Sequence, residues 1–364
     1  DQISSGDAEA ALDRVTPLVD VEEAVADADV VIEAVPEKME IKKDVYAEIE
    51  QYAPDEAVFA TNTSSLSITE LSEVTDRPAQ FCGMHFFNPP VRMQLVEVIS
   101  GAHTDDEVLD LIEDLAEEMG KTPVRVRKDS PGFIVNRILV PLMNEAAWIV
   151  EAGDATIEQV DSTTKFDMGL PMGSFELADQ VGIDVGYHVL DYMHSELGDA
   201  YRPCPLLVEK VEKDELGKKA GKGFYDYENG GAEIPTDAAR VDVRDRLLAG
   251  MANEVAGLIA ADVADAEAID RAVMLGAGFP DGPAKLADNA GLDGLVETLA
   301  DLREEPGEDR YEVVDYLRAA GAAGGFYGTD AAGEDGTGGA DYDTLEVSVE
   351  GRVGRITLDR PHRM

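Results

Sequence analysis

A histidine and a glutamate in the first third of the chain could together carry a proton transfer. His85 closes the apolar run FCGMHF, and Glu97 lies in the next apolar run, LVEVIS. A carboxylate that pairs with a histidine fixes the tautomer of the imidazole and makes the ring more basic. With five histidines in the whole chain, His85 is the candidate proton acceptor and Glu97 its candidate partner. The sequence does not show that they touch, and a histidine satisfied within a core is the alternative.

Hydroxyl and amide groups follow other apolar runs. In TNTSSLSITE, Asn62 and Ser64 come directly after a predicted strand, where polar groups face a cleft. Ser67 and Glu70 form a capping-box pattern, which accounts for Ser67 but not for Ser64. In DSPGFIVNR, Asn136 lies about one turn into a predicted helix. It could cap that helix, bridge two helices or present its amide to a substrate carbonyl.

Charged residues follow the first predicted strand, in EAVPEKMEIKK. Ligands of doubly wound folds bind outside the carboxyl ends of strands, so Glu37 and Lys42 could meet a ribose hydroxyl and a phosphate. The alternative is that they are ordinary charges at the start of a helix.

The elements that must position these residues alternate in type. Apolar runs at 28–36, 57–62, 79–87, 95–100 and 123–127 predict strands, and spacing at 38–51 and 105–119 predicts helices. This alternation indicates βαβ units and a mostly parallel sheet. From residue 131 to about 320 helical patterns dominate, so the second part is expected to be all-α.

The helical part contains an internal repeat. Residues 144–184 align without a gap on residues 253–293. The matched pairs are Asn144 with Asn253, Asp161 with Asp270, Pro171 with Pro280, and Asp179 with Asp288. Such a register predicts two related helical domains in tandem.

Composition limits the classes of function. Acids outnumber bases 76 to 30, a formal net charge of −46, which argues against nucleic-acid binding through the general field of the protein. The even spread of acids favours a halophilic source over an ordinary acidic protein, because salt screens self-repulsion. Cys82 and Cys204 are too few for a disulfide framework, and we expect no metal. No apolar run suits a membrane helix, and a cytoplasmic location is expected.

The two ends of the chain carry further signals. After Gly328 the segment TDAAGEDGTGGADYD is typical of a linker, and LEVSVEGRVGRITLDRP predicts a β-hairpin. The chain begins at Asp1 without a methionine, and the hairpin has nothing after it to pack against. We therefore expect a fragment.

The motifs, taken in order, resemble those of the L-3-hydroxyacyl coenzyme A dehydrogenase family. The resemblance covers roughly residues 20–327 and rests on the runs ADVVIEAVPEKMEIKK, FATNTSSLSI, FCGMHFFNPPVRMQLVEVI, GKTPVRVRKDSPGFIVNR and GLPMGSFELADQVGID. It implies an α/β Rossmann-type NAD domain followed by an all-helical domain that helps close the cleft and mediates dimerisation. The family's first strand and its G-x-G-x-x-G turn have no counterpart before residue 28, so we expect them to be missing here.

The resemblance also implies roles for individual residues. His85 matches the family's general acid/base and Glu97 the acid that pairs with it. Ser64 matches the serine that hydrogen-bonds the reacting oxygen near the nicotinamide, and Asn136 the asparagine that helps to hold substrate. The positions that match cofactor contacts are Glu37, Lys42, Asn88 and Lys219.

The tail VSVEGRVGRITLDRPHRM resembles the opening hairpin of the enoyl coenzyme A hydratase (crotonase) family. The expected units are a partial NAD domain, two helical copies, a linker and the start of a hydratase domain, at 1–129, 130–228, 240–328, 329–343 and 344–364. The implied function is NAD-dependent oxidation of (S)-3-hydroxyacyl-CoA in fatty-acid β-oxidation, within a bifunctional enzyme. A dehydrogenase of a free small hydroxy acid and a non-catalytic binding protein are the alternatives. Expected partners are an acyl-CoA thioester and either a second subunit or the second helical copy, but no nucleic acid or membrane.

Overall fold

Five strands form one sheet in the computed structural model, which describes residues 4–303, 309–328, 345–350 and 353–358. They lie side by side in chain order: β1 (Val30–Glu33), β2 (Val58–Thr61), β3 (Phe81–Phe86), β4 (Leu95–Ser100) and β5 (Thr122–Val126). β1, β2 and β3 are parallel, β4 is antiparallel to β3, and β5 is parallel to β4. The predicted mostly parallel sheet is confirmed, and each strand lies near its expected range.

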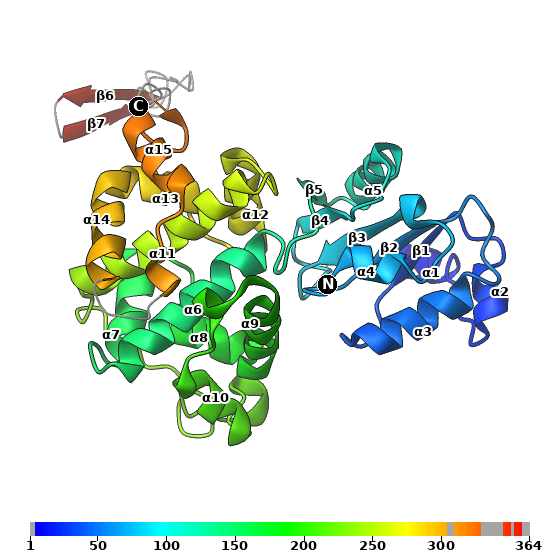
Figure 1. Ribbon diagram of the computed structural model, residues 1–364, viewed down its shortest axis with the longest axis horizontal. Helices are drawn as coiled ribbons and strands as arrows, with labels where there is room; N and C mark the ends of the chain where they lie inside the picture. The colour runs from blue at the N-terminus through cyan, green and yellow to red at the C-terminus, as the bar shows by residue number, and fades with distance from the viewer. Residues whose placement is uncertain (1–3, 304–308, 329–344, 351–352, 359–364) are drawn as a thin grey trace, which may run out of the picture.

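Helices cover both faces of this sheet (Figure 1). The helices of this part are α1 (Ser5–Leu12), α2 (Val21–Val25), α3 (Met39–Ile49), α4 (Ile68–Ser72) and α5 (Asp106–Glu118). The ring of Tyr46 in α3 packs on Phe59 and Phe81, which face one side of the sheet. On the other side α5 buries Val108 and Ile112 against the strands. The apolar spacing that predicted α5 is therefore the spacing that fixes it to the sheet.

The Ser67 side chain caps α4 as predicted, whereas the Glu70 side chain of the predicted capping box pairs with Lys43 instead. The Ser67 hydroxyl accepts a hydrogen bond from the backbone N–H of Glu70 at 3.1 Å. The same hydroxyl donates to Asp129 Oδ2 at 2.6 Å, and Asp129 also accepts the N–H of Thr69 at 2.9 Å. The start of α4 is thereby tied to the segment that leads out of the sheet.

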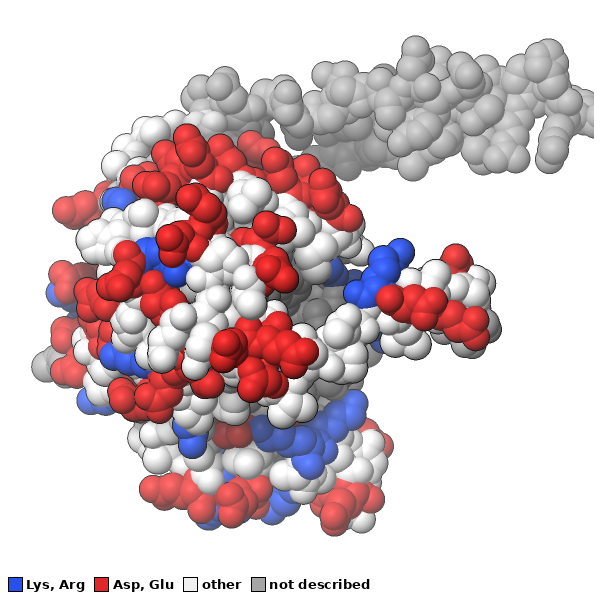
Figure 2. Space-filling model, turned by 90° about the vertical axis from the view of Figure 1, so that its right-hand side faces the viewer, with Lys and Arg blue, Asp and Glu red and all other residues white. Residues whose placement is uncertain are grey.

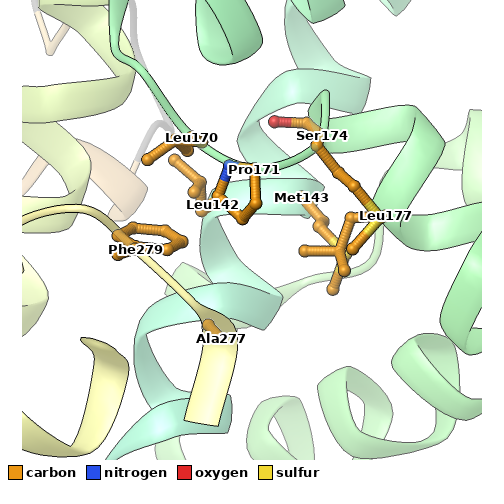
Figure 3. A pocket seen from close by; sticks show the side chains of 9 residues that line it. Leu142, Met143, Leu170, Pro171, Ser174, Leu177, Ala277 and Phe279 are labelled. Atoms are coloured by element: carbon orange, nitrogen blue, oxygen red, sulfur yellow. The ribbon is translucent and has the colours of Figure 1, made fainter. Parts of the chain in front are cut away.

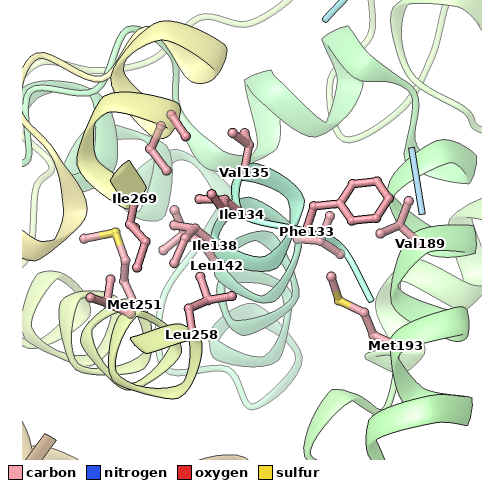
Figure 4. Close-up of a cluster of buried hydrophobic side chains, with 14 of the residues drawn as sticks. Phe133, Ile134, Val135, Ile138, Leu142, Val189, Met193, Met251, Leu258 and Ile269 are labelled. Carbon is pink, nitrogen blue, oxygen red and sulfur yellow. The ribbon is translucent and has the colours of Figure 1, made fainter. Parts of the chain in front are cut away.

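The rest of the described chain is helical up to residue 328. The first set comprises α6 (Val135–Glu151), α7 (Ile157–Ser162), α8 (Ser174–Val181), α9 (Ile183–Leu197) and α10 (Pro205–Glu212). The second comprises α11 (Val241–Ala260), α12 (Ala266–Ala277), α13 (Pro283–Ala290), α14 (Leu292–Leu302) and α15 (Asp315–Ala323). Short turns of helix lie at 78–80, 163–167, 199–201, 218–220 and 309–311. The α6 and α11 helices pack together at the centre (Figure 1), and Figure 4 shows α6 side chains such as Ile138 and Leu142 enclosed by neighbouring helices.

The two helical sets repeat the same buried hydrogen bonds. Asp161 accepts the N–H groups of Phe175 and Glu176, at the start of α8, and the Tyr225 hydroxyl at 2.8 Å. Burial raises the pKa of Asp161 to about 6. A Cβ at Gly173 would lie 2.3 Å from Asp161 Cγ, so glycine is required for this close approach.

The second set has the matching arrangement around Asp270. Its carboxylate accepts the N–H groups of Ala284 and Lys285, at the start of α13, and the Tyr327 hydroxyl at 2.8 Å. A Cβ at Gly282 would lie 2.0 Å from Asp270 Cγ. The prediction of two tandem related helical domains is confirmed.

Reciprocal polar contacts join α6 to α11. Arg137 Nε lies 2.6 Å from Glu254 Oε2, and the Tyr201 hydroxyl contacts both side chains. In the mirrored group, Arg246 Nε lies 2.5 Å from Glu145 Oε1, and the Tyr311 hydroxyl contacts both. Each set thus supplies an arginine and a tyrosine to a glutamate of the other. Such mutual contacts are those of an isologous interface, here within one chain.

The remaining expectations concern the surface and the tail. Acidic side chains spread over the face shown in Figure 2, with lysines and arginines in smaller groups. Within the described residues, no helix is both long and apolar enough to cross a membrane.

Cys82 and Cys204 are buried free thiols. β6 (Leu345–Glu350) and β7 (Val353–Leu358) pair antiparallel, which confirms the predicted hairpin, whereas the expected linker at 329–343 lies outside the described residues.

We predict that Tyr201→Phe and Tyr311→Phe each lower the free energy of unfolding by about 1.5–3 kcal/mol, because each hydroxyl bonds charged partners. Urea titration followed by circular dichroism, in molar salt, measures the change. Tyr316→Phe is the control, since Tyr316 is exposed. A loss of stability at one of the two positions alone would contradict the reciprocal interface.

Candidate active site

The candidate histidine and glutamate lie directly opposite each other on neighbouring strands. His85 in β3 is register partner to Glu97 in antiparallel β4. His85 Nδ1 lies 2.7 Å from Glu97 Oε2. Glu97 is fully buried and His85 is 4% exposed. The contact that the sequence left open is therefore made, in surroundings with little water to weaken it.

The second oxygen of Glu97 holds the start of a helix. Oε1 accepts the backbone N–H groups of Ile134 and Val135, at 3.1 and 3.0 Å, where α6 begins. These N–H groups have no partner within the helix, and the positive end of the helix dipole favours a carboxylate. One side chain thus joins the histidine to the first helix of the helical part.

Aromatic rings enclose the imidazole. The ring centroid of Phe87 lies 4.5 Å from that of His85, and the centroid of Phe133 lies 5.9 Å from it. With Nδ1 directed at Glu97, Nε2 on the opposite side of the ring is the nitrogen left for proton exchange. The pair can therefore act as a base whose protonated form is stabilised by Glu97.

The structure also brings Ser64 and Asn136 together. Asn136 Nδ2 donates to the Ser64 carbonyl at 3.0 Å, from the first turn of α6. The backbone N–H of Ser64 donates to Glu37 Oε1 at 2.8 Å. With its backbone fixed on both sides, Ser64 presents its hydroxyl from a defined position just beyond β2. Asn62 accepts the N–H of Phe86 at 2.9 Å, which joins this loop to the end of β3.

Glu37 organises the loop that carries Ser64. Besides the N–H of Ser64, its Oε1 accepts the Thr63 hydroxyl at 2.6 Å and the N–H of Ser65 at 3.1 Å. Its other oxygen lies 3.4 Å from Lys42 Nζ. The Glu37 side chain remains partly exposed, at 37%. Its expected contact with a ribose stays a prediction. Its contacts within the protein show that it also holds the loop that carries Ser64.

Lys42 is enclosed by the protein. Its Nζ lies 2.8 Å from Glu33 Oε1, and both side chains are buried. Glu33 also accepts the Thr61 hydroxyl at 2.7 Å and the Val35 N–H at 2.6 Å. In this arrangement Lys42 supports Glu37, and its direct contact with a cofactor stays a prediction. Sequence reasoning missed Glu33, although a carboxylate inside the apolar run VVIEAV is an unusual residue that could have indicated it.

Asn88 lies at the end of β3, beside the candidate active site, whereas Lys219 belongs to the helical part. Asn88 is exposed just past the end of β3, on the same side as the other strand ends. Lys219 belongs to the helical part, where its Nζ lies 2.5 Å from Asp184 Oδ1 at the start of α9. Within the described residues, Lys219 forms no hydrogen bond or ion pair with the groups at the strand ends. Its predicted contact with the cofactor therefore stays a prediction.

The site combines a base, a hydroxyl and an amide at the carboxyl ends of parallel strands. In the described part of the chain, no three His, Cys, Asp or Glu side chains are grouped to hold a metal ion. The arrangement suits movement of a proton between a bound hydroxyl or carbonyl and His85, with Ser64 and Asn136 directing the oxygen.

Two family descriptions match the chain. "3-Hydroxyacyl-CoA dehydrogenase, NAD binding domain" matches residues 1–130. "3-Hydroxyacyl-CoA dehydrogenase, C-terminal domain" matches twice, at 132–227 and 243–331. The two C-terminal matches coincide with the two sets of helices.

Curated proteins and solved structures agree with these matches. A probable 3-hydroxybutyryl-CoA dehydrogenase of Bacillus subtilis is 48% identical over 202 residues, 55% of this chain and 70% of that protein. The fatty acid oxidation complex subunit alpha of Vibrio parahaemolyticus is 37% identical over 316 residues, 82% of this chain and 44% of that protein. The crystal structure of 3-hydroxybutyryl-CoA dehydrogenase from Escherichia coli K12 has a TM-score of 0.80 at 27% identity, covering 88% of this chain and 87% of that one.

We predict that Lys42→Met lowers the free energy of unfolding by about 3–5 kcal/mol, because it leaves the Glu33 carboxylate buried without its cation. The double variant Lys42→Met/Glu33→Gln should lose less than the sum of the two single variants, since it removes both charges. Urea titrations of the four proteins measure the coupling. Strict additivity would contradict a buried ion pair.

Proposed function

We propose that this chain, which belongs to the 3-hydroxyacyl-CoA dehydrogenase family, oxidises (S)-3-hydroxyacyl-CoA thioesters to 3-oxoacyl-CoA. As a member it is an NAD-dependent oxidoreductase. The observation that carries the proposal is the buried contact of His85 with Glu97, beside the Ser64 and Asn136 pair.

The groups at the strand ends fit NAD. A doubly wound fold binds dinucleotides in the crevice outside the carboxyl ends of its strands. There the partly exposed carboxylate of Glu37 suits a ribose hydroxyl, and the exposed amide of Asn88 suits polar groups of the cofactor. Glu37 and Asn88 would hold NAD directly, Lys42 would support Glu37, and Lys219 would add a contact from the helical part. When bound, NAD supplies the hydride acceptor.

His85 acts as the base in this proposal. Nε2 accepts the proton of the substrate's 3-hydroxyl during oxidation, and the resulting imidazolium donates from Nδ1 to Glu97. Because Glu97 is buried, its negative charge stabilises the imidazolium more than a solvated carboxylate would. In the reverse direction the same nitrogen returns the proton.

Ser64 and Asn136 hold the substrate oxygens. The Ser64 hydroxyl donates to the reacting oxygen, whose negative charge grows as the proton leaves. Asn136 orients the substrate from the first turn of α6, and its bond to the Ser64 carbonyl keeps the two groups at a fixed separation. Both contributions depend on preorganisation of the donors.

We propose that the chain is divided into the following units. Residues 1–129 form the NAD-binding unit, 130–228 the first helical copy and 240–328 the second. The reciprocal contacts of α6 and α11 support the idea that the second copy completes within one chain a surface that a second subunit would otherwise supply. Residues 329–343 form a linker, and 344–364 begin a hydratase unit, which would make the enzyme bifunctional. We propose homo-oligomer formation as the alternative use of the helical surface.

The thioester class is favoured by relatives whose names specify 3-hydroxybutyryl-CoA and fatty acid oxidation. A role in fatty-acid β-oxidation accords with the name of the Vibrio relative, and a halophilic source accords with the net charge of −46. A cytoplasmic location is part of the proposal. A dehydrogenase of a free hydroxy acid, or a non-catalytic binding protein, is the competing assignment. NADH oxidation with acetoacetyl-CoA and with free acetoacetate, in molar salt, separates the three. Turnover of the free acid alone, or of neither compound, would overturn the proposal.

We predict that His85→Gln lowers kcat by ~10²–10⁴-fold while NADH affinity stays within twofold, because the variant loses proton transfer alone. His103→Gln serves as the control, since His103 is exposed on a loop and should leave turnover unchanged. Steady-state kinetics and calorimetric titration provide the two readouts. A His85→Gln enzyme with most of its turnover would show that another group is the base.

A further inference from the structure

The two helical copies differ at a position that lies against the candidate active site. The gap-free alignment of the two copies places Gly276 of α12 opposite Asp167 of the first copy, and its continuation places Val135 opposite Arg244. Asp167 faces Arg244, with Oδ2 3.4 Å from Nη1. At the matching place Gly276 faces Val135. An ion pair between the two copies is therefore replaced, at the place that symmetry relates to it, by a close contact between Gly276 and Val135.

The space without a side chain is filled by residues of the candidate active site. A Cβ at Gly276 would lie 2.7 Å from Leu95 Cδ2, 3.1 Å from Val135 Cγ2 and 3.2 Å from Phe87 Cε1. Distances below 3.0 Å are closer than non-bonded carbon atoms tolerate. Glycine at this position therefore allows α12 to lie directly against the end of β3 and the start of β4.

Each of the three neighbours is coupled to the catalytic pair. Phe87 packs its ring on His85 with 4.5 Å between centroids. Val135 donates its N–H to Glu97, and Leu95 lies on the same strand as Glu97, two residues before it. A displacement at Gly276 would therefore reach the imidazole through Phe87 and the carboxylate through β4 and α6.

The α12 helix also contacts the first copy and the end of the sheet region. Its end carries Ala277 and Phe279, which face Leu142 and Pro171 of the first copy across a small apolar pocket (Figure 3). At its start the N-cap residue Asp265 forms an ion pair with Arg127, in which both side chains are about half exposed. A new methyl group at Gly276 would press on Val135 and Phe87, which must give by a few tenths of an ångström, and on the end of the flexible Leu95 side chain.

From these contacts we infer that Gly276 is a positioning residue, through which the second helical copy holds His85 and Glu97 in their working geometry. The expected change in kcat rests on the proposed function, whereas the contacts of Gly276 with Leu95, Val135 and Phe87 do not depend on it. The second copy, which carries no candidate catalytic residue of its own, thereby becomes part of the active site.

The test compares Gly276→Ala with Gly257→Ala in the full chain. Both glycines are in helices, but a Cβ at Gly257 meets no atom within 4 Å. Alanine favours a helix over glycine, so neither variant should unfold at a lower urea concentration than the wild type for reasons of propensity. We expect Gly276→Ala to lower kcat roughly 3-fold to 10-fold, with the KM for acetoacetyl-CoA within twofold, since a misplacement of about 1 Å costs about 100-fold and Phe87 and Val135 move by less. Gly257→Ala should keep wild-type kinetics.

A second variant and a second readout separate positioning from loss of structure. Gly276→Ala/Leu95→Val removes the nearest methyl group and should recover most of the lost kcat. The ¹H–¹⁵N signal of the His85 ring should move in Gly276→Ala and stay in place in Gly257→Ala, whichever reaction the enzyme catalyses. Unchanged kcat and ring signal in Gly276→Ala, or a loss that only follows the unfolded fraction, would overturn the inference. An inactive wild type would instead overturn the proposed function, and the ring signal would still decide the role of Gly276.

Discussion

The Glu97 carboxylate joins the sheet to the helical part of the chain, and the geometry of the site depends on it. Its oxygens are fully buried, and burial of a carboxylate is costly unless hydrogen bonds compensate for the lost water. His85 Nδ1 and the two N–H groups at the start of α6 provide those bonds. The same contacts therefore satisfy the charge, orient the imidazole and fix the helix from which Asn136 reaches Ser64. The contacts of Glu97 that set the catalytic geometry are therefore also the contacts that join the sheet to the helical part.

Duplication explains how the helical part supports this centre within one chain. The Asp161 and Asp270 networks give each copy the same internal frame, and the reciprocal glutamates Glu145 and Glu254 join the copies. Symmetry of this kind produces two equivalent surfaces, of which one meets the sheet. Gly276 lies at that meeting, so the contact that replaces the Asp167–Arg244 pair occurs where the second copy packs against the sheet.

Much of the fold and part of the site could be predicted from sequence, for physical reasons. Apolar periodicity reports which face of an element is buried, so the strands and α5 were predicted near their observed ranges. His85 was found because it ends an apolar run, and Ser64 because it follows one and no capping pattern accounts for it. The roles of Glu33 and Gly276 were missed, since each depends on what a distant segment places beside it. Lys42 is buried against Glu33, a contact that depends on where the fold places the β1 carboxylate, and its contact with a phosphate stays a prediction.

The state of the His85 ring tests the central claim most directly. If the buried Glu97 carboxylate orients the base, Nδ1 carries the proton and Nε2 is unprotonated when the ring is neutral. Selective ¹⁵N labelling of histidine, with assignment by the signal lost in His85→Gln, distinguishes the two nitrogens by chemical shift. We expect a protonated Nδ1 that exchanges slowly with solvent, and an Nε2 whose chemical shift changes when substrate binds. A ring protonated at Nε2, with an Nδ1 that carries no proton, would contradict it.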